Sequence, residues 1–465
     1  MKATHSCSLL IAVFTLLAAC TGGNGQSDAG TDGGMCTGTE PDLQLFADTG
    51  HYTHDYYVSQ DNGDDSNDGS QAHPWRSLSP AGTGRMAGDR VHILAGTYFE
   101  CLRIEDAQGT ETNPIRFTGE GEVRIHCADR EAISASRIAY VTIEHMIVLS
   151  SGDDMNAIHI DDGSHHVIIR DNEVTGVGRA GDCIKVNGTD DVWVLHNDVH
   201  NVDTRAGSAQ GIDLVAVHRA TIRLNHVHDI ADSQGIFAKG GASDIVIERN
   251  LIERIASVTS DAIGIVAGGV STRARFIPLD ADYEAIRVIV RNNIVIGADG
   301  AGIGSQGCHD CMIVNNTLWN CGRTGYAIQL SIGWTGEQAP GDGTSSNVNV
   351  KIYNNLVGNP YGSMRAPIQA EPRHREGLEL SHNWWWNGVR DDVWDPGYNH
   401  DVGVDEPNSH VNEDPLVVDP DLPDIHLQAN SPARNAGRPM MDKVRWDFDG
   451  NCRVDAPDIG AYERP

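Results

Sequence analysis

Short hydrophobic stretches recur along most of this chain at a nearly fixed spacing. An asparagine followed two residues later by Val, Leu or Ile appears mostly 23 to 28 residues after the previous one, with two longer intervals. These asparagines are Asn172, Asn197, Asn225, Asn250, Asn293, Asn316 and Asn355. A repeat of this length is typical of architectures in which each unit buries its apolar face only by stacking on its neighbours.

Each repeat contains three predicted strands. A first strand opens thirteen or fourteen residues before the asparagine, at Ile158, Ile184, Ile212, Ile236 or Ile303. A middle strand is rich in β-branched residues, as in Val167–Ile169, Val192–Leu195, Ile245–Ile247 and Val288–Val290, and a third strand follows the asparagine. Three short strands per coil of roughly 25 residues predict an all-β parallel β-helix with coils about 4.8 Å apart. Asparagines in register would form an inward ladder that fixes how the coils stack, so we assign them no catalytic role.

The N-terminus is predicted to be a targeting segment. Lys2 precedes an apolar stretch from Leu9 to Leu17, which is too short to span a bilayer and fits a signal-peptide core. Leu17-Ala18-Ala19-Cys20 resembles the lipobox of bacterial lipoproteins and implies cleavage after residue 19 and lipidation of Cys20. Ordinary signal-peptidase cleavage with Cys20 merely nearby is the alternative. We expect a bacterial cell-envelope lipoprotein, held at the outer membrane or cell surface by its acyl chains.

Composition narrows the remaining possibilities. Residues 20–50 are rich in Gly, Thr, Asp and Ser and predict a flexible tether. No second linker divides the rest, so we expect the β-helix with its N-terminal cap over residues 51–400 and a closing segment over 401–465. The net charge of −31 excludes non-specific nucleic-acid binding. Any acidic ligand therefore needs local cationic groups for binding. We also expect the protein to be a monomer.

Eight cysteines remain beyond Cys7 and Cys20, an even number that is compatible with disulfides outside the cytoplasm. Cys101 and Cys127 lie about one coil apart and can pair. Cys308, Cys311 and Cys321 can supply another pair. Zinc binding at Cys308-x-x-Cys311 has little support, because few other ligands lie nearby in the sequence.

Both ends of the chain carry motifs of a known superfamily. Tyr56-Tyr57-Val58-Ser59, Pro74-Trp75-Arg76-Ser77-Leu78 and Ala95-Gly96-Thr97-Tyr98 resemble the N-terminal start of secreted β-helix proteins, and Asp458-Ile459-Gly460-Ala461-Tyr462-Glu463 resembles their closing segment. Together with the asparagine coils, the chain resembles the pectate-lyase-like right-handed parallel β-helix superfamily. That resemblance implies a fold used by lyases, hydrolases, epimerases and adhesins, so function has to come from a site.

A candidate site emerges when the coils are aligned on their opening isoleucines, because alternate residues of each strand face outward. Polar residues then form columns on one outer face. Two residues before the isoleucine stand Asn156, Asp182, Gln210, Gln234 and Asp261; one after it stand His159, Lys185, Asp213 and Phe237; three after it stand Asp161, Asn187, Val215 and Lys239. A solvated face with cross-strand salt bridges would also look like this, but the concentration favours a groove that binds polysaccharide.

The chemistry that suits these groups is β-elimination from a uronate, in which a base removes the proton next to a neutralised carboxylate. Lys185 shares a column with Asp213 and is expected to be ion-paired, so Lys239, beside the apolar Val215, is the better base. Two insertions should border the groove. The first carries Arg273 and Arg275, which can hold a carboxylate or act as the acid, and the second carries Trp334, which can stack on a sugar.

A calcium ion would reconcile the acidity of the chain with an anionic substrate, and its candidate ligands are Asp161, Asp182, Asp213 and Asp261. His159, Asn187, Gln210, Gln234, Arg275 and Trp334 are the candidate substrate-binding residues. Two alternatives remain open. A non-catalytic glycan-binding protein or adhesin would use the same columns for recognition alone. A glycoside hydrolase needs two suitably spaced carboxylates, and Asp182 and Asp213 make a marginal pair.

Overall fold

The structure of the chain is a computed structural model. It describes residues 40–150, 152, 154–176, 180–203, 209–257, 262–331, 333–334, 344–364, 366–388, 403–421 and 424–464. The predicted signal peptide, Cys20 and Asp261 lie outside these residues. The described residues form a parallel β-solenoid of about 11 turns with little helix, which confirms the predicted fold class. None of its helices is long and apolar enough to span a membrane.

The first strand of each coil contributes to a sheet that we call sheet 1. Within the described residues, sheet 1 has ten strands in strictly sequential order. They are β3 (Leu102–Glu105), β5 (Ile133–Ser136), β8 (Ile158–Asp161), β11 (Ile184–Asn187), β14 (Ile212–Val215), β17 (Gln234–Lys239), β20 (Ile263–Gly268), β24 (Ala301–Gln306), β28 (Tyr326–Ser331) and β33 (Ala366–Ala370). Sequential order means that each coil pairs only with the coils before and after it.

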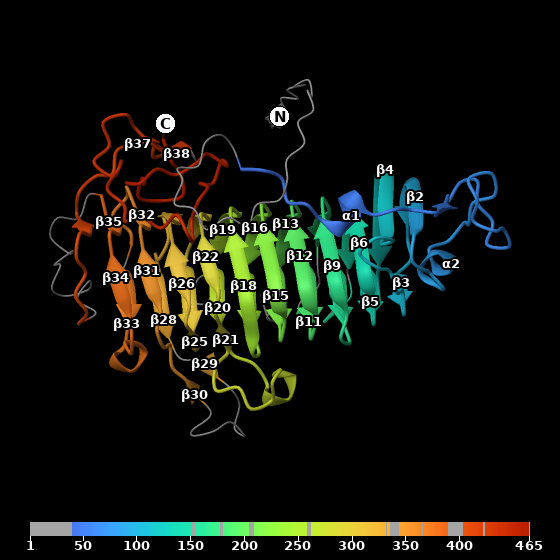
Figure 1. Ribbon diagram of the computed structural model, residues 1–465, viewed down its shortest axis with the longest axis horizontal. Coiled ribbons are helices and arrows are strands. Elements are labelled where there is room, and N and C mark those ends of the chain that lie inside the picture. Colours follow the sequence, from blue (N-terminus) through green and yellow to red (C-terminus); the bar gives the residue numbers. More distant parts are fainter. Residues whose placement is uncertain are drawn as a thin grey trace, which may run out of the picture. The chain divides into compact units, whose positions relative to one another are not determined.

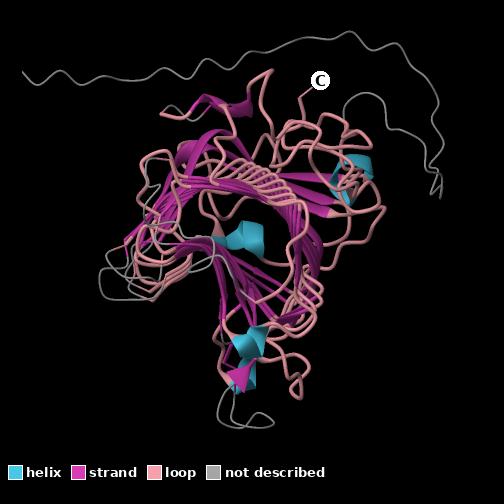
Figure 2. Cartoon of the chain, turned by 90° about the vertical axis from the view of Figure 1, so that its left-hand side faces the viewer, coloured by secondary structure: helices cyan, strands magenta, loops and turns pink. Residues whose placement is uncertain are grey.

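The other two strands of each coil belong to a second, larger sheet, which we call sheet 2. Its middle strands are β1 (His54–Val58), β2 (Asp89–Tyr98), β4 (Ile115–Cys127), β6 (Ala139–Glu144), β9 (His165–Arg170), β12 (Asp190–Leu195), β15 (His218–Arg223), β18 (Ala242–Glu248), β22 (Ile289–Arg291), β26 (Met312–Val314), β31 (Lys351–Tyr353) and β34 (Glu379–Ser381), extended by β21 (Ala285–Ile286) and β25 (Cys308–His309). Its third strands are β7 (Ile147–Ser150), β10 (Glu173–Thr175), β13 (Asp198–Asp203), β16 (His226–Ala231), β19 (Leu251–Ala256), β23 (Ile294–Ala298), β27 (Thr317–Trp319), β32 (Leu356–Gly358), β35 (Trp384–Trp386) and β36 (His410–Val411). Figure 1 shows the coils stacked in chain order, and Figure 2, viewed along the stack, shows their strands superposed around the core.

The predicted asparagine ladder is confirmed, and it extends one coil further, to Asn383. Each side-chain amide donates to the Oδ1 atom of the asparagine in the next coil, over 2.9–3.1 Å. The same Oδ1 atoms accept the backbone N–H of the preceding ladder asparagine. The ladder therefore satisfies buried polar groups at the bend between the middle and third strands, as a purely structural device should.

The residue before each ladder asparagine adopts a left-handed backbone conformation. Leu224 and Arg249, with φ of 56° and 53°, do so although neither residue favours it. The adjacent asparagine offsets this local cost because its side chain satisfies the polar groups that the bend exposes. The sharp bend thus explains why asparagine recurs at one fixed position in the coil.

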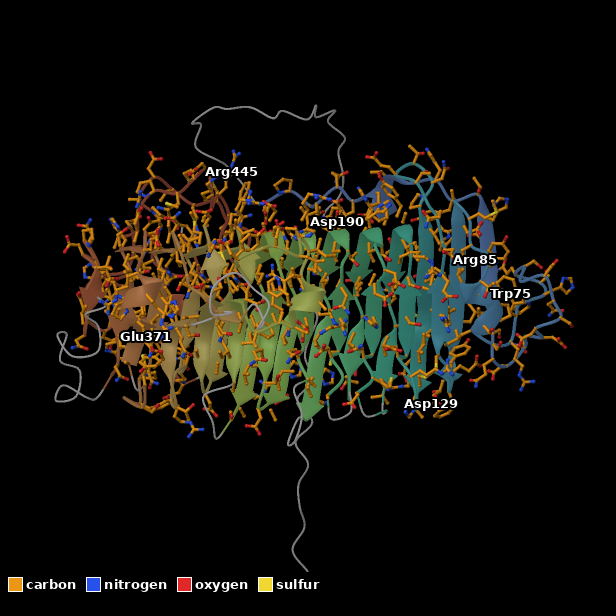
Figure 3. The ribbon with its side chains drawn as sticks, turned by 90° about the horizontal axis from the view of Figure 1, so that it is seen from below. Trp75, Arg85, Asp129, Asp190, Glu371 and Arg445 are labelled. Atoms are coloured by element: carbon orange, nitrogen blue, oxygen red, sulfur yellow. A yellow bond between two sulfur atoms is a disulfide. The ribbon has the colours of Figure 1, made fainter. Side chains whose placement is uncertain are left out.

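The N-terminal end of the stack is covered by an aromatic cluster and a short helix. Trp75 stacks on Tyr56 with 5.2 Å between ring centroids, and the Arg85 guanidinium lies 4.0 Å from the Tyr56 ring centroid. Figure 3 labels Trp75 and Arg85 near this end of the stack. Helix α2 (Ser79–Gly82) packs against β3 and β1. These residues belong to the region for which the N-terminal motifs predict a cap.

Residues 40–50 differ from the predicted tether, because they dock on the solenoid. Helix α1 (Phe46–Thr49) places Phe46 edge-on against Tyr140 and Trp193, at centroid distances of 5.4 and 6.1 Å. Glu40 forms ion pairs with Arg223 and Arg249. Buried aromatic contact and paired charge outweigh the entropy that a free linker would keep.

The C-terminal segment adds one coil strand, β36, and then runs back along the outside of earlier coils. Arg453 is fully buried there and donates to Glu463 over 3.2 Å and to Asn292 over 2.8 Å. The hairpin β37 (Val417–Asp419) and β38 (Asp424–Leu427) belongs to the same segment. The closing segment therefore covers the side of the stack near the asparagine ladder.

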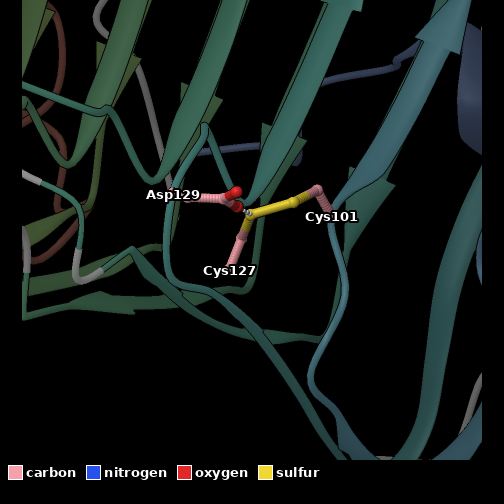
Figure 4. Close-up of side chains that lie close together, drawn as sticks. All are labelled: Cys101, Cys127 and Asp129. Atoms are coloured by element: carbon pink, nitrogen blue, oxygen red, sulfur yellow. Dashed lines mark hydrogen bonds between the residues drawn. A yellow bond between two sulfur atoms is a disulfide. The ribbon is translucent and has the colours of Figure 1, made fainter.

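Two of the expected disulfide pairs are present. Cys101 pairs with Cys127 across adjacent coils, as Figure 4 shows, with Asp129 beside them. Cys308 pairs with Cys311, which leaves Cys321 a buried free thiol and rules out a thiolate zinc site at that pair. Disulfides are typical of oxidising compartments, and the extracytoplasmic location stays a prediction.

Candidate functional site

The polar columns predicted on the first strands lie side by side on the outer face of sheet 1. Lys185 is the register partner of His159 on one side and of Asp213 on the other. Val215 is the partner of Lys239, and Asp213 is the partner of Phe237. The intervening residues Ile184, Ile212 and Ile236 are fully buried. The alignment on opening isoleucines is thus confirmed for these coils.

The alignment is wrong by two residues in the next coil. Ile236 pairs with Ile265 rather than Ile263, and Gln234 pairs with Ile263. Asp261, which that alignment placed in the column of Asp182 and Gln210, lies outside the described residues. The sequence Ile263-Gly264-Ile265 offers two isoleucines at equivalent spacing, so hydrophobic pattern alone does not choose between them.

Two lysines converge on one buried aspartate. Lys239 Nζ lies 3.2 Å from Asp213 Oδ2, and Lys185 Nζ contacts the same oxygen from the preceding coil. Lys185 Nζ also lies 2.9 Å from Asp182 Oδ2. Asp213 is fully buried and its other oxygen, Oδ1, has no hydrogen-bond partner among the described residues. Lys185 is therefore ion-paired as predicted, and Lys239 is paired as well.

These contacts push the pKa values of the two carboxyls apart. Burial raises the pKa of Asp182 to about 6, with the nearby charge of Asp213 adding to the effect and Lys185 opposing it. Burial would also raise the pKa of Asp213, but the charges of Lys239 and Lys185 outweigh it and hold that pKa below its usual value. For Lys185, burial is outweighed by Asp213 and Asp182, which raise its pKa. Lys185 is thus fixed as an ammonium group.

The lysines form part of a hollow of about 310 Å³ on the face of sheet 1. Its lining comprises Asn156, His159, Lys185, Asn187, Val215, Lys239, Val270, Ser271, Thr272 and Arg275. None of these is acidic, although the chain has a net charge of −31. Only five lysines occur in the sequence, and two of them are here. The hollow is therefore a cationic site on an acidic protein.

One side of the hollow comes from the insertion between β20 and β21, which projects beside the β29–β30 hairpin in Figure 1. Buried Glu284 holds this insertion, because its carboxylate accepts the backbone N–H groups of Gly240 over 2.9 Å and Ser271 over 2.8 Å. Gly269, with φ of 153°, passes directly over the Phe237 ring. A Cβ there would lie 2.5 Å from that ring and 3.2 Å from Lys239 Cβ, so the close approach requires glycine.

The two predicted arginines of this insertion differ in position. Both belong to the short 3-10 helix η1 (Arg273–Arg275). Arg275 lines the hollow. Arg273 instead donates to the carbonyl of Ala281 over 2.5 Å and lies over the Phe276 ring at 4.9 Å. Arg273 therefore stabilises its own loop, and Arg275 is the cation that can reach a ligand.

His159 and Asn187 lie together at the opposite side of the lysines. Asn187 Nδ2 is 3.0 Å from His159 Nε2, and His159 Nδ1 is 3.5 Å from Glu131 Oε1. Asp161 does not line the hollow, but its carboxylate is 3.9 Å from His159 Nε2. Burial raises the pKa of Asp161. His159 and Asn187 are thus placed to contact a ligand that also touches Lys185.

The column that contains Gln210 and Gln234 acts as a second ladder. Asn156 Oδ1 accepts the backbone N–H of Asp182 over 2.9 Å, and Asp182 Oδ1 accepts that of Gln210 over 2.7 Å. Gln210 Nε2 in turn donates to Gln234 Oε1 over 3.3 Å. Gln210 is buried, and neither glutamine lines the hollow. Their side chains serve coil stacking in this structure.

Trp334 belongs to the two-residue strand β29 (Gly333–Trp334), which pairs with β30 (Thr344–Ser345). Its side chain is not among those described.

Two of the four carboxylates expected to bind Ca²⁺, Asp182 and Asp213, do not fit that ion as they are arranged here. Calcium binds six to eight oxygens, whereas Asp182 and Asp213 already share the ammonium group of Lys185, which occupies the position between them. A second cation there would meet an existing one at close range. We therefore assign no chemical step to calcium, and its involvement stays a prediction.

Several residues that build the hollow were not among the candidate site residues predicted from the sequence. Phe237 supports the Lys239 ammonium, which lies 4.0 Å from its ring centroid. Glu284 anchors the insertion, while Val270, Ser271 and Thr272 complete the lining. The outward position of Phe237 was visible in the column pattern. No local signal links Glu284 to Gly240, because the bond spans 44 residues across an insertion.

Comparison with known proteins agrees with this architecture. A family model described as the right-handed β-helix region matches residues 125–276. The chain is also 31% identical over 147 residues to YwoF, an uncharacterized protein of Bacillus subtilis (strain 168). That match covers 28% of this chain and 30% of the relative, so the chain spans less than a third of that relative's length.

Solved structures share the fold at low identity. The pectate lyase Pel9A has a TM-score of 0.57 at 17% identity, covering 90% of this chain and 98% of that one. A rhamnogalacturonan lyase has a TM-score of 0.51 at 15% identity, covering 71% and 87% of the two chains. XylC, solved with xylose, has a TM-score of 0.51 at 12% identity, covering 88% and 98%. The chain therefore has the right-handed, pectate-lyase-like β-helix fold.

Proposed function

We propose that this protein binds an acidic, uronate-containing polysaccharide along sheet 1 and cleaves it by β-elimination. The observation that supports this most is the convergence of Lys185, Lys239 and Arg275 on one hollow without a lining acid, in a chain of net charge −31. Such a hollow attracts an anionic group locally while the rest of the surface repels it. The proposal is in keeping with lyases among the proteins that share this fold.

In the proposed reaction, Arg275 and Lys185 hold the uronate carboxylate and neutralise its charge, which acidifies the neighbouring C–H bond. Lys239 in its neutral form takes that proton. The electron pair forms a carbon–carbon double bond, the glycosidic carbon–oxygen bond breaks, and the leaving oxygen takes a proton from solvent. Arg275 can reach the carboxylate because it lines the hollow.

Lys239 is the better base of the two lysines. Lys185 contacts two carboxylates, which raise its pKa. Among the described residues Lys239 forms a salt bridge with Asp213 only, and its side chain also meets the apolar Val215 and Phe237. Glu284 is a second carboxylate close enough to interact with Lys239 electrostatically.

The pairing of both lysines with Asp213 favours a second candidate, a non-catalytic surface glycan-binding protein or adhesin. In that case Lys239 stays an ammonium group and contributes only charge. A glycoside hydrolase receives less support, because Asp182 and Asp213 are buried beneath Lys185 and no described residue lining the hollow is a carboxylate.

The deciding experiment follows the ultraviolet absorbance of unsaturated uronate while the full chain meets a panel of uronic-acid polysaccharides, with added Ca²⁺ or with chelator. We expect an increase that Lys239→Ala abolishes. Lys351→Ala is the matched control, since Lys351 pairs with Glu379 on β31 and β34 and does not line the hollow. Glycan binding without any increase in absorbance would contradict the lyase proposal and support the glycan-binding protein or adhesin. If the protein neither binds nor cleaves any of these polysaccharides, both the lyase and the glycan-binding proposals are refuted.

We further propose that lipidation at Cys20 anchors the protein to the bacterial cell envelope. Fractionation of cells expressing the wild type and Cys20→Ala tests this, because loss of the lipid should move the protein from the membrane to the soluble fraction. Retention of Cys20→Ala in the membrane fraction would contradict the anchor.

A further inference from the structure

A histidine cluster lies on the outer face of sheet 2, on a different face of the coils from the lysine hollow. His226 and His228 are separated on β16 by the buried Val227, so both imidazoles point outward. Asp198 on β13 is the register partner of His226 in the preceding coil. The rings of His226 and His228 stack with 4.1 Å between centroids.

We propose that Asp198, His226 and His228 form a binding site for a divalent transition metal, with Zn²⁺ as its representative ion. One ligand atom of each residue lies within 4.8 Å of the other two. Asp198 Oδ1 is 2.9 Å from His228 Nε2 and 3.4 Å from His226 Nδ1. Tetrahedral Zn²⁺ with bonds of about 2.0–2.1 Å places its ligand atoms roughly 3.3–3.4 Å apart. The three atoms therefore need only small shifts to share one ion.

The far nitrogen of each imidazole already has a carboxylate partner. His226 Nε2 is 2.9 Å from Glu253 Oε2, and His228 Nδ1 is 2.7 Å from Asp229 Oδ2. Metal-binding histidines usually donate their other N–H to such a carboxylate, which fixes the tautomer and makes the ligand nitrogen more basic. Both rings are thus held with Nδ1 of His226 and Nε2 of His228 facing Asp198, and an ion there takes the place of the hydrogen bond between His228 and Asp198.

The charges around the cluster also favour a cation. Asp198, Asp229 and Glu253 carry negative charge, and Glu173 lies on the preceding coil as the register partner of Asp198. Arg254 is the nearest opposing charge, since its guanidinium is 2.9 Å from His228 Nδ1. It is neutralised by Asp229 over 2.8 Å and by Glu253 over 3.2 Å. The local balance therefore remains negative.

The ligand set indicates which metals suit the site. Two imidazole nitrogens and one carboxylate oxygen are typical of Zn²⁺ and its neighbours Co²⁺, Ni²⁺ and Cu²⁺, whereas Ca²⁺ and Mg²⁺ prefer oxygen ligands alone. The side chains of Asp198 and His226 are 49% and 38% exposed, so solvent can reach the ion and supply a fourth ligand. Because Asp198 and the histidines belong to adjacent coils, the metal would link those coils.

The test is calorimetric titration of the metal-stripped full chain with Zn²⁺, together with the visible absorption of a Co²⁺-loaded sample. We expect one metal per chain and a tetrahedral Co²⁺ spectrum without thiolate bands. Asp198→Asn, His226→Gln and His228→Gln should each weaken binding by about 100-fold, and Glu253→Gln by about 10-fold, because it removes only a supporting hydrogen bond.

His218→Gln is the matched control, because His218 on β15 bonds Ser243 Oγ over 2.9 Å and offers no atom to the cluster. Its affinity should equal that of the wild type. Circular dichroism and thermal melting of each metal-free variant separate lost ligands from lost folding, and a ligand variant that melts like the wild type must still show the weaker binding. Absence of Zn²⁺ binding to the wild type, binding unaffected in the ligand variants, or thiolate bands that place the ion on cysteine would each overturn the proposal.

Discussion

Lys239 Nζ, on the coil that follows Asp213, lies 3.2 Å from Asp213 Oδ2, and Lys185 contacts the same oxygen from the preceding coil. One buried carboxylate thus holds two ammonium groups in neighbouring positions on sheet 1. Without Asp213 the two cations would repel each other, and the hollow would lose the group that fixes both. This arrangement positions charge for an anionic ligand, and it makes Asp213 the most sensitive residue of the site.

Asp213→Asn should therefore destabilise the protein strongly. Breaking a buried pair by removing one partner costs about 3–5 kcal/mol, because it leaves buried charge without compensation. Chemical unfolding measures the loss. The control is Asp244→Asn, which breaks the solvent-exposed pair with Arg287 and should cost less than about 1 kcal/mol. Equal stability of the two variants would contradict the buried network.

The stability contributed by Asp182 should depend on pH. Its folded-state pKa of about 6 exceeds its value of about 3.9 in unfolded chains, so the folded protein binds more protons between these pH values. This contribution is fully present below pH 4 or so and is lost as pH rises through about 6. Relative to Asp182→Asn, the wild type should lose stability over this window.

Urea unfolding of both proteins at several pH values measures that difference, which should amount to a few kcal/mol at most. The sign is diagnostic. A wild type that instead gains stability relative to Asp182→Asn between pH 4 and 6 or so would mean that Lys185 dominates over burial and Asp213.

Arg275→Ala should weaken binding of a uronate oligosaccharide by about 10-fold, the effect of losing one charge-assisted hydrogen bond. Calorimetry measures the dissociation constant. Arg287→Ala removes another exposed guanidinium, which pairs with Asp244 and does not line the hollow, so it should leave affinity unchanged. An Arg275→Ala variant that binds like the wild type would remove the arginine from the proposed site.

Asn250→Ala should destabilise the solenoid by roughly 2–4 kcal/mol, since it leaves buried donors and acceptors without partners. The Asn250 amide donates to Ile222 O and to Asn293 Oδ1, both over 2.9 Å, and its Oδ1 accepts the Asn225 backbone N–H over 3.0 Å. Asn113→Ala is the control and should change stability little, because among the described residues the Asn113 side chain donates only to Thr112, over 3.2 Å. Thermal melting of both variants measures the loss of stability, and equal melting temperatures would contradict a stabilising role of the ladder.

Much of the architecture could be predicted because a solenoid is governed by local pattern and nearest-neighbour stacking. Alternating hydrophobicity set which residues face outward, and the asparagine period set the register of Lys185 with Asp213. The histidine pair on β16 also follows from alternation, although its significance depends on Asp198 in the preceding coil.

The sequence by itself therefore determined the coils, the ladder and the pairing of Lys185. Only the tertiary structure decided that Lys239 reaches Asp213 as well, that Arg275 rather than Arg273 lines the hollow, and that β20 pairs two residues away from the simplest alignment. These outcomes depend on rotamers, on an insertion anchored by the distant Glu284, and on two isoleucines that satisfy the core equally well. Such choices are made by packing and buried charge between segments far apart in the chain, which leave no periodic signal in the sequence.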